Sequence, residues 1–285
     1  MRLCLIALLA PLLTACVTSP VSTTQRPETN LFHTAPSVPS HSPSLSALAD
    51  AQHPVRLTRS PHLGAQFLKR NQQDSAGDLW RRIRSGFQMP DLENHLVQRQ
   101  LAGYSSHPDY VARMTERSKR YLFHIIEALE ARQMPMELAL LPFVESAYNP
   151  RALSVAKAAG IWQFVPATGR EYDLTQNLFR DERRDVLAST NAALDHLTKL
   201  YDMFGDWHLA LAAYDWGQGN VQRAILRNQR AGLPTDYASL RMPNETRNYV
   251  PKLQAIKKIV LNPRQYHVEL ADIPDRPYFS TVIVT

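Results

Sequence analysis

The sequence predicts a mainly α fold with one principal domain. Apolar residues recur every three or four positions in several stretches, most regularly in 184–204 and 243–260, as on one face of a helix. Residues typical of helix starts, such as Asp206 and Pro243, precede several of these stretches. No internal repeat is apparent, and only the tail after Pro263 turns β-prone. These observations favour seven or more helices over a sheet-based fold.

The first fifteen residues have the layout of a secretory signal. Arg2 supplies one positive charge, and the apolar run that follows is too short to span a bilayer. Leu13-Thr14-Ala15-Cys16 resembles a bacterial lipobox, in which the signal is cut before the cysteine and the thiol receives a diacylglycerol. We therefore expect a lipoprotein signal peptide in 1–15 and lipidation at Cys16, with an ordinary signal and an incidental cysteine as the alternative. By the same resemblance, Val17 after the cysteine favours the periplasmic face of the outer membrane.

Residues 16–76 are rich in Pro, Ser and Thr, and we expect them to form a disordered tether behind the lipidated cysteine. Such sequence buries too little apolar surface to offset the loss of chain entropy on folding. The whole chain carries a formal charge of +6 and a pI near 9.4. This balance favours an anionic partner: nucleic acid, a membrane surface or an acidic cell-wall polymer. The sequence has no zinc-finger spacing, RNA-binding motif or long Lys/Arg run, which argues against nucleic acid.

A helical N-terminal extension is expected over 77–130. Two short helices, near 79–87 and 92–101, should be separated by Met89-Pro90. His107-Pro108-Asp109 should open one longer helix, whose apolar face continues to Leu129. Its basic residues, at positions 113, 117, 119 and 120, are most simply a solvated face, with contact to a substrate as the alternative.

In the stretch Leu138–Phe164, an apolar segment is followed directly by a single carboxylate, Glu145. A helix over 136–144 should end near Glu145, and Pro142 should kink its last turn. Burial raises the pKa of a carboxyl group, and a glutamic acid so placed can donate a proton near neutral pH. The alternative is an exposed Glu at a helix end. Between residues 149 and 160 a short hairpin or an irregular loop is expected.

Three further helices are expected toward the C-terminus. The first runs through 184–204, the second begins at Asp206-Trp207, and the last carries Tyr249 on its apolar face. Gly217-Gln218-Gly219 follows the second helix and predicts either a helix break or close approach to a ligand.

Four separated motifs now stand in order along the chain. They are Glu145-Ser146 with Asn149-Pro150 and Ser154; Gly160-Ile161-Trp162-Gln163-Phe164; Ala213-Tyr214-Asp215-Trp216-Gly217; and Glu245-Thr246-Arg247-Asn248-Tyr249-Val250. This order and spacing resembles the soluble-lytic-transglycosylase-like domain of bacterial murein lytic transglycosylases. The resemblance covers about residues 78–284, with a catalytic domain over 131–262 and a C-terminal tail over 263–285.

The resemblance implies a lysozyme-like fold with extra N-terminal helices, and an enzyme that needs no metal or organic cofactor. The implied reaction cleaves the β-1,4 bond between N-acetylmuramic acid and N-acetylglucosamine in peptidoglycan. The muramyl 6-hydroxyl then closes onto the anomeric carbon and gives a 1,6-anhydro end. One Glu suffices for this chemistry, because it can first give a proton to the leaving oxygen and then take one from the hydroxyl.

The family pattern assigns roles to eight residues. Glu145 would be the single acid/base, and the substrate-binding residues would be Ser154, Gln163, Phe164, Tyr214, Asp215, Glu245 and Tyr249. Trp162 fits a cleft wall or a plain core position, and Tyr249 has the same core alternative. The partners implied are the peptidoglycan strands and, through acylated Cys16, the lipid of the outer membrane.

The chain departs from the family pattern at three positions. Asp215 stands where Asn is usual, Trp216 where a small residue is common, and Lys157 where Gly or Ala is common. Asp215 could alter the pKa of Glu145 or cap a helix, and Lys157 could meet an anionic stem peptide or be solvated. Two rival functions follow: a lysozyme-type hydrolase on the same fold, and a non-catalytic wall-binding lipoprotein.

Overall fold

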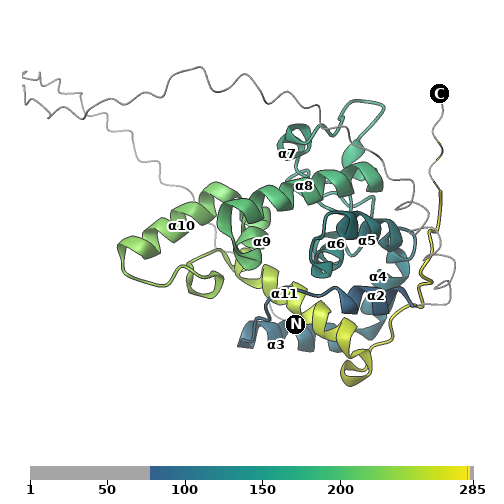
Figure 1. Ribbon diagram of the computed structural model, residues 1–285, viewed down its shortest axis with the longest axis horizontal. Helices are drawn as coiled ribbons and strands as arrows, with labels where there is room; N and C mark the ends of the chain where they lie inside the picture. The colour runs from purple at the N-terminus through teal and green to yellow at the C-terminus, as the bar shows by residue number, and fades with distance from the viewer. Residues whose placement is uncertain (1–77, 281, 283–285) are drawn as a thin grey trace, which may run out of the picture. The chain divides into compact units, whose positions relative to one another are not determined.

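The computed structural model describes residues 78–280 and 282, and most of this part of the chain is helical (Figure 1). The predicted signal, lipidation site and tether lie outside the described residues. The α-helices are α2 (Leu79–Ser85), α3 (His95–Ser105), α4 (Pro108–Ser118), α5 (Leu122–Ala131), α6 (Leu141–Ser146), α7 (Pro166–Glu171), α8 (Val186–Phe204), α9 (Trp207–Trp216), α10 (Gln218–Arg230) and α11 (Asn244–Leu261). The 3₁₀ helices are Met136–Leu140, Glu182–Arg184, Tyr237–Ser239 and Pro263–Tyr266. The prediction of a mainly α fold is confirmed.

β pairing within the described residues is limited to isolated bridges. Two of them, Leu153 with Ala159 and Ala159 with Phe164, lie in the segment expected to be a hairpin or an irregular loop. The described part of the tail makes one, between Pro274 and Asp78. None of the helices in residues 78–280 combines the length and the apolar character needed to cross a membrane.

Side-chain caps explain where several helices begin. An Asp or Asn before the first helical residue accepts hydrogen bonds from backbone N–H groups that have no partner inside the helix. This cap is present in α2, α3, α8 and α9, at Asp78, Asn94, Asp185 and Asp206. Asp206, which predicted the start of α9, is therefore also the residue that caps it.

The single helix expected from His107 to Leu129 is two helices, α4 and α5, so this prediction was wrong. The chain turns over residues 119–121 between them. Ser118 ends α4, and its hydroxyl donates to the carbonyl of Thr115 (2.6 Å), three residues back. Such local hydrogen bonds compete with the helical ladder. The apolar spacing runs on across the break because each helix buries its own face.

The helix expected over 136–144 also divides in two. A 3₁₀ helix covers Met136–Leu140, and α6 begins at Leu141 with Pro142 in its first turn, where proline costs no helical hydrogen bond. Pro142 therefore starts a helix instead of kinking one. Left-handed backbone at Ala147 (φ 50°) and Tyr148 (φ 59°) ends α6 immediately after Glu145-Ser146.

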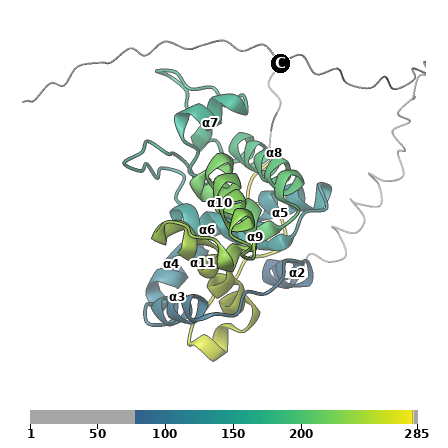
Figure 2. The same cartoon turned by 90° about the vertical axis from the view of Figure 1, so that its left-hand side faces the viewer.

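Helix α11 packs against α3 on one side and α9 on the other (Figures 1 and 2). A buried ion pair also joins α11 to the segments that precede α3 and α6. Glu137 is fully buried and accepts backbone N–H hydrogen bonds from Gln88 (3.0 Å) and Met89 (2.9 Å). Lys257 of α11 lies 3.0 Å from Glu137 and 2.8 Å from Asp91. The N-terminal helices are thereby tied to the same helix that carries Tyr249.

Candidate active site

A cavity of about 730 Å³ lies where the end of α6, the loop after it, α8, the end of α9 and the start of α11 meet. The structure brings all eight residues assigned by the family pattern to its lining: Glu145, Ser154, Gln163, Phe164, Tyr214, Asp215, Glu245 and Tyr249. These residues come from segments up to about a hundred positions apart in the sequence. The cavity is thus one site built by the fold from the four motifs.

Glu145 lies at the C-terminal end of α6 and is partly exposed to the cavity. Its neighbour Ser146 donates a hydrogen bond to the carbonyl of Ile161 (3.0 Å), which joins the helix end to the second motif. On the other side, the Nε of Arg117 donates to the carbonyl of Ala147 (2.8 Å). Arg117, expected on a solvated face, therefore helps to hold the end of the helix that carries Glu145.

The environment of Glu145 favours the protonated acid. Burial raises the pKa of this carboxyl from 4.5 to about 8, and the nearby charge of Asp215 adds to the rise. Tyr249 is buried, with 3% of the residue exposed. Its hydroxyl donates a hydrogen bond to Oε1 of Glu145, and this bond opposes the rise in the pKa of Glu145. At neutral pH Glu145 therefore holds a proton that it can give to a leaving group.

Three other titratable groups of the cavity, His196, Glu171 and Asp215, are less suited to donate that proton. Burial lowers the pKa of His196 to about 4, so its imidazole is neutral at pH 7. The hydrogen bond from Lys199 (2.7 Å) lowers the pKa of Glu171. Burial raises the pKa of Asp215, but the hydroxyl of Thr246 donates to its Oδ2 (2.6 Å) and stabilises the charged form. Of these four groups, Glu145 is the one best suited to donate a proton.

Asp215 and Gly217 resolve two alternatives left open by the sequence. Asp215 does not cap a helix: it lies in the last turn of α9, and its carboxylate binds Thr246 of α11. Gly217 has φ 92° and separates α9 from α10, and it also lines the cavity. It is therefore both a helix break and part of the site.

Trp162 is a core residue, whereas Phe164 and Tyr214 line the cavity. The Trp162 ring is fully buried, and its Nε1 donates to the hydroxyl of Thr190 (2.9 Å). The hydroxyl of Tyr214 donates to the backbone carbonyl of Trp162 (2.8 Å). Tyr214 thus joins α9 to the second motif, and the structure records no hydrogen bond from its hydroxyl to Glu145 among the described residues.

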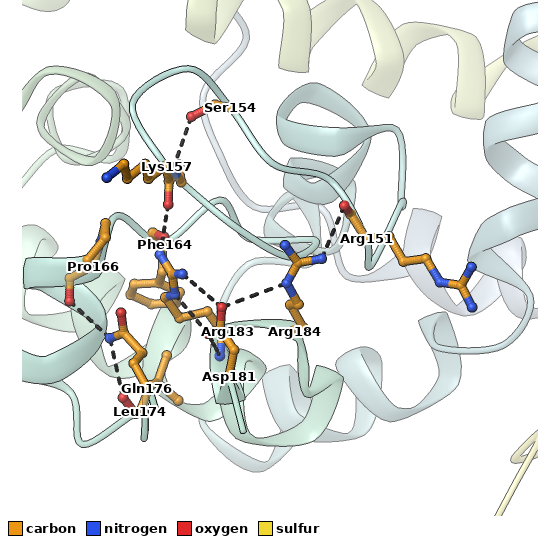
Figure 3. A network of polar contacts seen from close by, with 11 residues as sticks. Arg151, Ser154, Lys157, Phe164, Pro166, Leu174, Gln176, Asp181, Arg183 and Arg184 are labelled. Carbon is orange, nitrogen blue, oxygen red and sulfur yellow. Dashed lines mark hydrogen bonds and ion pairs between the residues drawn. The ribbon is translucent and has the colours of Figure 1, made fainter. Parts of the chain in front are cut away.

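Arg183 organises the loop that runs from Ser154 to Phe164 (Figure 3). Its guanidinium group forms two 2.8 Å contacts with the carboxylate of Asp181. The same group donates to the backbone carbonyls of Lys157 (2.8 Å) and Phe164 (3.1 Å). Arg183 is 7% exposed, and such a fork-shaped group can satisfy several acceptors at once. One buried side chain therefore sets the spacing of this wall of the cavity.

Lys157 lies in this loop but is absent from the cavity lining. Its backbone has φ 62°, in the left-handed region that glycine adopts without strain. The side chain is exposed. The left-handed backbone at this position therefore explains why the family pattern has Gly there, and the Lys157 side chain is solvated.

Replacing Gly160 with Ala should destabilise the protein by about 3 kcal/mol or more. Gly160 has φ 83°, and a Cβ atom there would lie 1.9 Å from the carbonyl oxygen of Arg183. The matched control is Gly103→Ala in α3, where a Cβ atom meets nothing within 4 Å and should stabilise the helix by up to about 1 kcal/mol. Urea unfolding of the two variants measures the difference. Equal stabilities would contradict the close approach of these two segments.

Tyr249→Phe should shift the pH dependence of the reaction that the family resemblance implies. Wild-type activity should fall as the pH rises through about 8, because Glu145 must be protonated to act as an acid. The Tyr249 hydroxyl stabilises the ionised form of Glu145, so its removal should raise the pKa and move this fall to higher pH. The profile of kcat/KM against pH measures the shift. A fall at the wild-type pH or below would contradict this role of the hydroxyl.

Among the titratable residues that line the cavity, Glu171, His196 and Lys252 were not predicted from the sequence. Lys252 follows Tyr249 by three positions on the last helix, and this spacing could have revealed it. His196 gave no such signal, because it lies in none of the four motifs. Its ring packs against Tyr214 (5.4 Å between centroids) and shares a hydrogen bond with Tyr172 (2.8 Å). In the described part of the chain, no group of three His, Cys, Asp or Glu side chains is arranged to hold a metal ion.

Comparison with known proteins finds the same domain type. Residues 123–233 match the family model described as Transglycosylase SLT domain. Membrane-bound lytic murein transglycosylase D of Escherichia coli (strain K12) is 46% identical over 195 residues, which are 68% of this chain and 43% of the relative. A putative tributyltin chloride resistance protein of Alteromonas sp. (strain M-1) is 42% identical over 110 residues, 38% of this chain and 53% of the relative.

A third relative is more distant. Membrane-bound lytic murein transglycosylase C of Glaesserella parasuis serovar 5 (strain SH0165) is 29% identical over 153 residues, 47% of this chain and 42% of the relative. The chain therefore spans less than half the length of the two transglycosylases that it matches.

Proposed function

We propose that this chain, a member of the transglycosylase SLT domain family through residues 123–233, is a lytic transglycosylase of peptidoglycan. The proposed reaction cleaves the β-1,4 bond between N-acetylmuramic acid and N-acetylglucosamine and leaves a 1,6-anhydro-muramyl end. The observation that carries the proposal is the location of Glu145 in the same cavity as the other seven predicted site residues. Burial there raises the pKa of the Glu145 carboxyl to about 8. The printed names of two relatives, both lytic murein transglycosylases, support the substrate.

In the proposed mechanism Glu145 acts twice. It first gives its proton to the glycosidic oxygen, so that the bond to the muramyl anomeric carbon breaks and positive charge develops on the sugar. The Glu145 carboxylate then takes the proton from the muramyl 6-hydroxyl while that oxygen bonds to the anomeric carbon. The proton count balances without water, and the enzyme returns to its starting state. Attack within one sugar benefits from a high effective concentration.

We propose binding roles for the other residues of the cavity. Ser154, Gln163 and Glu245 would hydrogen-bond the sugars, and Phe164 would form part of the cleft wall. Tyr249 would hold the Glu145 carboxyl, and Tyr214 would hold the second motif in place. Their common location in the cavity lining supports these assignments.

A hydrolase is the second candidate, and Asp215 is the observation that favours it. Asp215 lines the same cavity as Glu145, and a second carboxylate could activate water. Digestion of purified sacculi followed by mass spectrometry separates the two functions. The transglycosylase should release 1,6-anhydro muropeptides, each lighter by one water than the hydrolase product. Reducing ends without anhydro products would overturn our proposal, and binding without any product would favour a non-catalytic wall-binding protein.

We further propose that the protein acts at the periplasmic face of the outer membrane. Residues 1–15 would be the lipoprotein signal, Cys16 the acylated anchor, and 16–76 the tether that lets the catalytic part reach the wall. The lipobox-like sequence supports this placement, as does the membrane-bound naming of two relatives. Metabolic labelling with an alkyne fatty acid, beside Cys16→Ser, tests the anchor. Unchanged labelling of Cys16→Ser would overturn it.

A further inference from the structure

Lys252 places a cation inside the cavity. It follows Glu245 by seven residues and Tyr249 by three on α11, so the three side chains share one face of the helix. All three line the cavity, and Lys252 is only partly exposed. The chain thus presents an ammonium group beside the proposed acid.

Lys252 differs in its pairing from most lysines of the described chain. Four of the six lysines in residues 78–280 form ion pairs: Lys119, Lys199, Lys257 and Lys258. The fifth, Lys157, is exposed and lies outside the cavity lining. Lys252 takes part in no ion pair or side-chain hydrogen bond recorded among the described residues, although Asp215 and Glu245 line the same cavity. Its three N–H donors are therefore available to a ligand.

The proposed substrate offers one kind of group for such a cation. N-Acetylglucosamine units are neutral, and their hydroxyl and amide groups form hydrogen bonds without a charge. The muramyl unit carries a lactyl group, which is a carboxylate in glycan without stem peptides and an amide where a stem is attached. The stems bring carboxylates of their own. A charge-assisted bond from an ammonium to a carboxylate is stronger than a neutral hydrogen bond.

We propose that Lys252 recognises a carboxylate of the muramyl units and so distinguishes murein from a neutral glycan of the same linkage. The inference rests on the proposed function, since it names the substrate group that the same cavity binds. Lys252 is a specificity residue in this account, and Glu145 retains the chemistry. The simpler role, in which Lys252 only offsets the charges of Asp215 and Glu245, predicts no distinction between anionic and neutral glycans.

Binding measurements separate these roles. Glu145→Gln, which should not turn over substrate, is compared by calorimetry with Glu145→Gln/Lys252→Met. The ligands are chitohexaose, which is neutral, glycan strands stripped of stem peptides, and strands that retain their stems. Glu145→Gln/Lys119→Met serves as the control for loss of a positive charge elsewhere. Because the measurement is binding, it does not depend on whether the products are anhydro sugars or hydrolysed ends.

Lys252→Met should weaken binding of an anionic strand about tenfold or more, the loss expected for a hydrogen bond to a charged group. Binding of chitohexaose should change less than about twofold, as for a site with no charged contact. Loss confined to stripped strands identifies the lactyl carboxylate, and loss confined to strands with stems identifies a stem carboxylate. Equal losses on all three ligands, or no loss on either anionic strand, would overturn the proposal. Failure of the Lys252-intact protein to bind any glycan would instead count against the proposed function.

Discussion

Glu145→Gln should lower kcat on purified sacculi by about 10³-fold or more, near the upper range for loss of a general acid. The amide keeps the shape of the side chain but cannot give and then take a proton. Binding of sacculi should be largely retained. Release of soluble muropeptides over time measures the rate, and sedimentation with sacculi measures the binding.

Glu245→Gln is the matched control, because it removes an exposed carboxylate from the same cavity. Loss of one exposed contact should slow the reaction by less than about tenfold. If Glu245→Gln were the slower variant, the acid would have been assigned to the wrong carboxylate.

Stability provides a second measure of the same Glu145 variant. Folding holds Glu145 protonated, so the folded state binds one more proton than the unfolded state between pH 4.5 and about 8. Wild-type stability should therefore fall relative to Glu145→Gln as the pH rises through this interval. Above pH 8 the variant should be the more stable protein, and urea unfolding at pH 5 and pH 9 measures the change.

Lys257→Met should destabilise the protein by about 3–5 kcal/mol, the cost of leaving a buried charge without its partner. Glu137 is fully buried, and Lys257, at 6% exposure, is its paired cation. The control, Lys258→Met, removes the adjacent lysine, whose pair with Glu93 lies at the surface and should contribute at most about 1 kcal/mol.

Urea unfolding at pH 7 of both lysine variants measures this difference. Adding Glu137→Gln to Lys257→Met should recover part of the loss, because the unpaired side chain is then neutral. Equal losses for Lys257→Met and Lys258→Met would contradict the importance of the buried pair.

The sequence was most informative where local chemistry decides the structure. Asp206 predicted a helix start because a cap depends on the residues that immediately follow it. The left-handed turn at Ala147 was not predicted, since an alanine gives no sign of such backbone. The break between α4 and α5 was also missed, because apolar spacing continues through it and hydroxyl hydrogen bonds leave no periodic signal.

The site was predictable as a set of residues but not as a set of contacts. Ordered motifs brought Glu145 and Tyr249 into one hypothesis, yet nothing local indicated that the Tyr249 hydroxyl binds the Glu145 carboxyl. The Glu137–Lys257 pair was missed for the same reason: its partners are 120 positions apart and lie in no motif. Apolar periodicity predicts which face of a helix is buried. Which side chains contact that face depends on how the helices pack in the folded protein.

The position of α11 has a consequence for dissecting the protein. The recognised domain ends at residue 233, whereas α11 begins at Asn244 and supplies the hydroxyl that binds Glu145. A fragment cut at the limits of that domain would retain the acid and lose the side chain that holds it. It would also uncover the apolar surfaces that α11 covers on its neighbours. The smallest active fragment should therefore extend from α2 through α11, well beyond residues 123–233, which match the family model.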